Sequence, residues 1–114
     1  LEKRGFHIAK LSPKLLTKLL GFQRNELTEH LIYQRLAKQV PSPNNQQLFA
    51  KLATDELRHY HVYRKYTNQD VKPNTWKVFL IYWCARFFGF SFVLKLMEKG
   101  EERAKNTYLE VSNH

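Results

Sequence analysis

The chain has 114 residues, a formal net charge of +9 and one cysteine, Cys84. This length allows a single domain with a modest core, and 43% hydrophobic residues exclude a disordered tail. A single cysteine excludes an internal disulfide framework and a cysteine-rich zinc site, and it fits a reducing compartment. The positive charge favours an anionic partner, either nucleic acid or an acidic membrane surface.

The first predicted helix begins at Ser12-Pro13, with serine as the cap and proline at the first helical position. It is expected to run to about Gln39 because Pro41 stops it. Residues 1–11 contain no apolar run of signal-peptide length and are predicted to be an N-terminal extension.

Ser42-Pro43 repeats the same start signal for a second helix, which is expected to end near Tyr66, before Pro73. A third helical region is predicted from about Asn74 to the C-terminus, with a bend or break at Gly89. No segment shows the alternation of a strand with a pairing partner. The predicted fold class is therefore all-α.

An aromatic stretch, Val78–Leu94, holds 17 residues with one charge, Arg86. A membrane-spanning helix needs about 20 apolar residues, and a central arginine makes insertion costly. We therefore expect a buried helix or an interfacial one, with Trp76, Tyr82 and Trp83 at the level of lipid headgroups.

Each predicted helix carries a glutamate at the centre of its apolar stripe when residues are placed at 100° intervals. The first stripe comprises Leu15, Leu19, Phe22, Glu26, Tyr33 and Ala37. The second comprises Asn45, Phe49, Leu52, Glu56, His59 and Tyr63. The third comprises Phe90, Leu94, Met97, Glu101, Ala104 and Tyr108. A solvated charged face would not have this pattern.

The first and third stripes also match each other with an offset of 75 residues, so that Glu26 corresponds to Glu101 and Tyr33 to Tyr108. Chance similarity between helices is the alternative to a duplication. A duplication predicts two helical hairpins, each with a Glu-bearing helix and a Glu-x-x-His helix. The second Glu-x-x-His would then fall near position 131, beyond residue 114.

Glu56 and His59 are three residues apart, so both can reach one point on the same side of a helix. A buried carboxylate is costly unless it is protonated, paired or bound to a cation. Carboxylate oxygens with an imidazole nitrogen suit iron or manganese. Single glutamates on two helices and Glu-x-x-His on two others form the di-iron site of a four-helix bundle.

The segments NELTEHLIYQRLAKQ, ATDELRHYHVYRKYT and LKLMEKGEERAKNTY resemble ferritin-like, rubrerythrin-type di-iron proteins. More closely, they resemble the domain that precedes membrane-embedded transporters of the vacuolar iron/manganese transporter kind. The resemblance covers about residues 12–112. It implies a ferritin-like antiparallel helical bundle that binds two iron ions, or manganese, in each complete site.

The resemblance also assigns roles to individual residues of this chain. The implied metal ligands are Glu26, Glu56, His59, Glu98 and Glu101. Tyr33 and Tyr108 would bond through their hydroxyls to ligand carboxylates. No catalytic residue beyond the metal ligands is implied.

The sequence departs from the family because no second Glu-x-x-His follows. Either the chain is a fragment that lacks the fourth helix, a partner chain completes the site, or the site is degenerate. We favour the fragment, since the repeat predicts the missing helix just downstream. The predicted architecture is thus three long helices with a fourth missing or supplied by a partner chain, and a homodimer is expected.

Simpler structural roles compete with the metal site. The glutamates could pair with Arg or Lys, and Glu29 replaces Glu26 as a ligand if the helix register differs. His30 and His61 are expected to face solvent or cap a helix, while Arg58 and Tyr60 are expected to face away from the site.

The resulting functional hypothesis is a domain that binds Fe(II) and reacts it with oxygen or peroxide, or senses iron, beside a membrane transporter in the cytoplasm. The alternative is a basic helical module, at a membrane surface or in an oligomer, with no redox activity. Nucleic acid is not an expected partner because no basic cluster or nucleic-acid motif stands out.

Overall fold

A computed structural model of the chain describes residues 12–99, and all its regular structure in that range is helical. Three helices are α2 (Pro13–Gln39), α3 (Pro43–Thr67) and α4 (Thr75–Phe88), and residues 90–99 are also helical. The all-α prediction is confirmed, as are the two Ser-Pro helix starts. No helix in the described range is long and apolar enough to cross a membrane.

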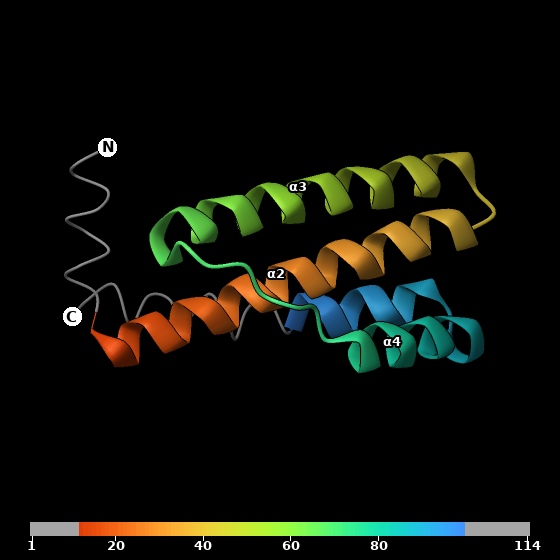
Figure 1. Cartoon of the computed structure of the whole chain (residues 1–114). Coiled ribbons are helices and arrows are strands. Elements are labelled where there is room, and N and C mark those ends of the chain that lie inside the picture. Colours follow the sequence, from red (N-terminus) through yellow and green to blue (C-terminus); the bar gives the residue numbers. More distant parts are fainter. Residues whose placement is uncertain (1–11, 100–114) are drawn as a thin grey trace.

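Helices α2 and α3 form a long antiparallel pair (Figure 1). Residues 68–74, which connect α3 to α4, pass across α2 and are called the crossing segment below. Helix α2 contacts both α3 and α4, whereas α3 and α4 do not contact each other. Helix α2 is therefore the central element of the described fold. Because α3 covers one side of α2 and α4 covers another, two sides of α2 are shielded from water.

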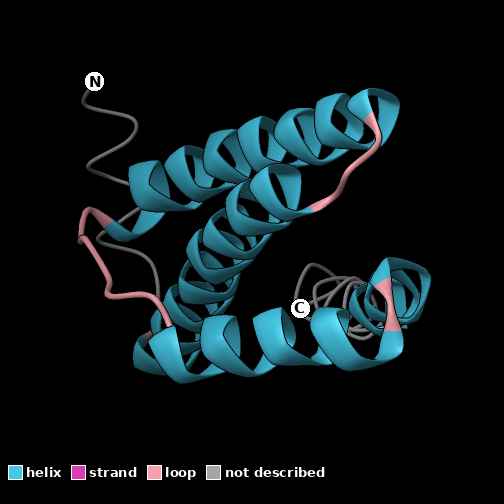
Figure 2. Ribbon diagram, turned by 90° about the vertical axis from the view of Figure 1, so that its right-hand side faces the viewer, coloured by secondary structure: helices cyan, strands magenta, loops and turns pink. Residues whose placement is uncertain are grey.

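The end of α4 is fixed by Gly89, which has φ 93° and ψ 162°. A side chain at that φ would be strained, so glycine suits the position. The chain turns there into residues 90–99, which run at a steep angle to α4 from its end (Figure 1 and Figure 2). The predicted break at Gly89 is confirmed.

One hydrophobic core joins all four helical segments. Its buried members are Ile32, Tyr33, Leu36, Val40, Phe49, Ala53, Val78, Ile81, Ala85, Val93 and Met97. Phe49 lies at the junction, since its ring centroid is 6.1 Å from that of Tyr33 and 6.5 Å from that of Phe90.

Polar side chains of α2 hold the crossing segment in place. The fully buried Gln23 donates from Nε2 to the Gln69 carbonyl at 2.7 Å and accepts from the Thr67 hydroxyl at 2.6 Å. The Thr28 hydroxyl accepts from the Asn74 backbone N–H at 2.9 Å. Buried polar groups bonded in this way determine the route by which α4 reaches α2.

We predict that Gln23→Leu lowers the free energy of unfolding by about 2 kcal/mol, because the Gln69 carbonyl and the Thr67 hydroxyl lose their bonds to Gln23. Urea unfolding measures this change. Gln34→Leu, at an exposed position of the same helix, is the matched control and should change stability little. Equal effects of the two substitutions would contradict the anchoring role.

Candidate metal centre

The candidate site lies between α2 and α3, midway along both helices. Helix α2 supplies Glu26, and α3 supplies Glu56 and His59. One potential ligand atom from each of these residues lies within 4.8 Å of the other two. The structure thus brings together three residues that the sequence predicts as metal ligands.

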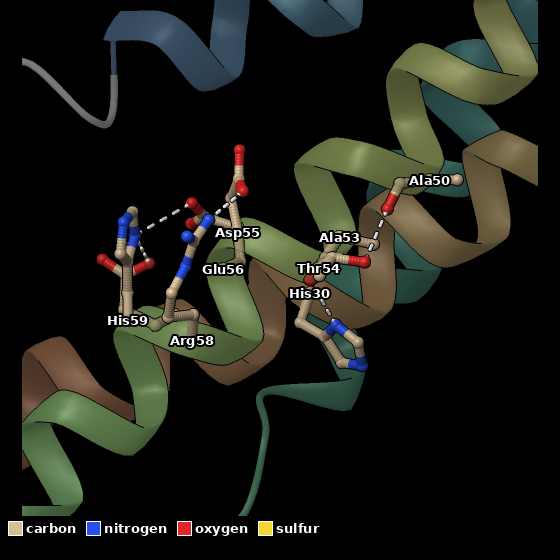
Figure 3. Close-up of polar contacts among 9 residues, drawn as sticks. His30, Ala50, Ala53, Thr54, Asp55, Glu56, Arg58 and His59 are labelled. Atoms are coloured by element: carbon tan, nitrogen blue, oxygen red, sulfur yellow. Dashed lines mark hydrogen bonds and ion pairs between the residues drawn. The ribbon is translucent and has the colours of Figure 1, made fainter.

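The imidazole of His59 lies beside both carboxylates. Its Nδ1 is 3.4 Å from Glu26 Oε2 and 3.3 Å from Glu56 Oε1. Figure 3 shows His59 beside Glu56, with a dashed line between the two side chains, as their three-residue spacing on α3 allows. The imidazole is therefore the part of the site that faces solvent.

Burial changes steadily across the cluster. The side chain of Glu56 is 6% exposed and that of Glu26 is 18% exposed, whereas that of His59 is 53% exposed. One oxygen of each glutamate is shielded from solvent. The site therefore has a dry carboxylate floor and an open imidazole rim, through which a cation can enter.

A fourth residue, Glu29, adds a second carboxylate of α2 to the floor. It is 2% exposed and accepts a hydrogen bond from Asn25 Nδ2 at 3.0 Å. Burial raises the pKa of Glu29 to about 8, and hydrogen bonding to Glu56 together with the charge of Glu56 acts in the same direction. Lys77, which donates from Nζ to Asn25 Oδ1 at 3.3 Å, opposes the rise in pKa.

The position of Glu29 follows from the packing of α2 on two neighbours. The predicted stripe is centred on Glu26, but the buried arc of α2 also includes Thr28, Glu29 and Ile32. These residues extend the arc because α4 as well as α3 lies against α2. Periodicity alone identified Glu29 only as a substitute for Glu26, whereas both residues lie at the cluster.

The remaining predicted site residues have different locations. Glu98 is exposed and is not part of the cluster. Tyr33 is buried against Phe49, with its ring centroid 6.1 Å away. Glu101 and Tyr108 lie outside the described residues.

The neighbours of the Glu-x-x-His motif also differ in part from expectation. Arg58 is exposed and pairs with Asp55, as Figure 3 shows. Tyr60 is not part of the cluster, but it is buried and donates its hydroxyl to Asp70 Oδ1 at 3.2 Å. His61 is exposed, as predicted.

His30 is half-buried and has a structural contact that the sequence did not indicate. Its Nδ1 is 2.6 Å from the Ala53 carbonyl oxygen (Figure 3). A donated hydrogen bond at this distance ties α2 to the backbone of α3 within one helical turn of Glu56. His30 therefore fixes the spacing of the two helices that supply the site.

The donor set fits a hard or borderline divalent cation. Two carboxylate oxygens and one imidazole nitrogen suit iron, manganese or zinc. Each ligand atom would lie about 2.1 Å from the ion, so two ligand atoms on opposite sides of it would be about 4.2 Å apart. Small side-chain rotations would bring atoms within 4.8 Å of one another to such distances. The cluster can thus hold one cation with coordination positions left open.

The chain matches no known family model, no curated protein and no solved structure.

We predict that the metal-free protein loses stability as pH rises from 5 to 8. The folded-state pKa of Glu29, about 8, exceeds its ordinary value of 4.5, so the native state binds more protons than the unfolded state across this range. The free energy of unfolding then falls by at most about 1.4 kcal/mol per pH unit from this group. Below pH 4.5 the Glu29 carboxyl is protonated in both the folded and the unfolded protein, so it no longer makes the free energy of unfolding depend on pH.

Glu29→Gln removes the titrating proton and can still accept the hydrogen bond from Asn25. Its urea-unfolding free energy should vary less with pH between 5 and 8 than that of the wild type, with both proteins measured in chelator. The two pH profiles would be parallel if Glu29 were ionised in the folded protein at pH 6.

Proposed function

We propose that Glu26, Glu56 and His59 hold one iron or manganese ion and that the domain belongs to the di-iron carboxylate class. The observation that carries this proposal is the convergence of one imidazole and two carboxylates from two helices on one point. Several carboxylates buried so close together destabilise the fold unless protons or cations neutralise their negative charge. A divalent cation would do so at once for Glu26, Glu56 and the adjacent Glu29.

A bound Fe(II) ion would supply one-electron chemistry with oxygen or peroxide, which is the basis of ferroxidase and peroxide-scavenging activities. The residues of the chain contribute geometry and access. Glu56 and Glu29 form a water-poor floor, while the half-exposed His59 leaves one side open for the oxidant. Iron sensing for an attached membrane transporter would use the same ligands.

The bundle that the resemblance implies would need a fourth helix and a second set of ligands. Helices α2 and α3 form one hairpin with a Glu-bearing helix and a Glu-x-x-His helix, which is half of such a bundle. We propose that a downstream segment or a partner chain supplies the other half. A homodimer of this chain would complete the site by bringing two such hairpins together.

We predict that the wild type retains iron or manganese after anaerobic loading and desalting, and that Glu56→Ala/His59→Ala does not. Loss of two ligands should weaken binding by more than the roughly 10- to 100-fold that results from losing an outer partner of a ligand. Elemental analysis of metal per chain is the measurement. The stoichiometry also distinguishes one ion per chain from a site shared between two chains.

The matched control is Asp55→Ala/Arg58→Ala, which removes an exposed ion pair at the same spacing on the same helix. It should retain the metal of the wild type, and circular dichroism should show equal helicity in all three proteins. Exposure of the loaded samples to oxygen or peroxide then reports whether the bound Fe(II) is oxidised. A wild type without metal, or equal metal in both double variants, would leave the basic non-redox module as the function.

A further inference from the structure

Helix α4 is apolar on two opposite faces. Val78, Ile81 and Ala85 lie in the core, as expected for a helix that packs on α2. On the opposite side, five large apolar side chains are between 39% and 75% exposed. We call these five residues the aromatic stripe: Trp76, Phe79, Leu80, Trp83 and Phe87. Helices that are apolar all round are normally buried, so the stripe is a candidate docking surface.

The rings of the stripe form a continuous row. Ring centroids are 5.7 Å apart for Trp76 and Phe79, 6.2 Å for Phe79 and Trp83, and 6.0 Å for Trp83 and Phe87. Steps of three or four residues place them on one side of the helix. The four rings therefore present one ordered surface along the length of α4.

Charge around the stripe indicates which partner fits it. Residues 71–97 contain four Lys or Arg and no Asp or Glu. Three of the four, Lys72, Arg86 and Lys95, are exposed, whereas Lys77 donates to Asn25 and is half-buried. A second copy related by a two-fold axis would bring cations against like cations, whereas an anionic surface would attract them.

Aromatic residues with basic neighbours are typical of helices that lie in a membrane interface. Tryptophan is favoured at headgroup level because its ring is apolar and its indole N–H needs a polar partner. Arginine and lysine extend toward lipid phosphates while their alkyl stems cover apolar surface. A 14-residue helix with these features lies in the plane of the interface.

We propose that α4 docks on the surface of a bilayer that contains anionic lipid, with the aromatic stripe at the boundary between headgroups and acyl chains. Arg86 and Lys95 would contact lipid phosphates. The inference does not depend on whether the candidate metal centre binds metal.

The chain carries its own reporter, because its two tryptophans, Trp76 and Trp83, both belong to the stripe. We predict a blue shift of tryptophan emission and co-sedimentation of the full chain with phosphatidylcholine vesicles that contain phosphatidylglycerol. Vesicles of phosphatidylcholine alone should bind much less. Arg86→Gln/Lys95→Gln should weaken binding about fivefold for each cation removed.

Trp83→Gln/Phe87→Gln tests the stripe directly and should weaken vesicle binding at least tenfold, with unchanged helicity by circular dichroism. The matched control is Leu48→Gln/Tyr66→Gln, which removes two similarly exposed apolar residues of α3 and should bind as the wild type does. Three results would overturn the proposal. The first is no binding to anionic vesicles, and the second is equal weakening of binding by both double variants. The third is a blue shift of tryptophan emission that depends on protein concentration without lipid, because it would identify a second copy of the chain as the occupant of the stripe.

Discussion

The carboxylate pair Glu29–Glu56, buried between α2 and α3, is the constraint on which the rest of the site depends. Glu29 is 2% exposed and Glu56 is 5% exposed, and the charge of Glu56 adds to the cost of ionising Glu29. Such a pair persists in a folded protein only if a proton or a cation neutralises it. Two neighbours partly offset this cost, because Asn25 donates a hydrogen bond to Glu29 and His59 lies beside Glu56 and Glu26.

The scaffold around this pair is held by contacts that are distant in sequence. His30 joins α2 to the Ala53 carbonyl, and Gln23 joins α2 to the segment that leads into α4. Both contacts determine how closely α3 and α4 approach α2. Since α4 also supplies Lys77, whose charge lowers the pKa of Glu29, the route of the crossing segment affects the electrostatics of the site.

Local signals in the sequence predicted the helices well. Helices begin at the Ser-Pro pairs and end just before Pro41 and Gly89. These signals are local, because each residue restricts or extends the dihedral angles of its own backbone. The Glu56-x-x-His59 pair was predictable for the same reason, since helix geometry alone brings the two residues together. Glu26 was placed at the cluster by periodicity.

Features that depend on packing between helices were not predictable from periodicity. Glu29 is buried because α2 is covered on two sides, and Tyr60 is buried with its hydroxyl donated to Asp70 of the crossing segment. The aromatic stripe shows the converse: an apolar segment predicted as buried or interfacial has one face in the core and the other exposed. Sequence composition sets the apolar content of a helix, but topology decides which face is covered.

The most direct test of the metal centre is an anomalous-scattering map from crystals grown anaerobically with Fe(II) and measured on both sides of the iron absorption edge. We expect an iron peak at coordinating distance from Glu26, Glu56 and His59, at the interface of α2 and α3. Crystals with iron bound only elsewhere, or with no iron and the three side chains arranged as described here, would contradict it.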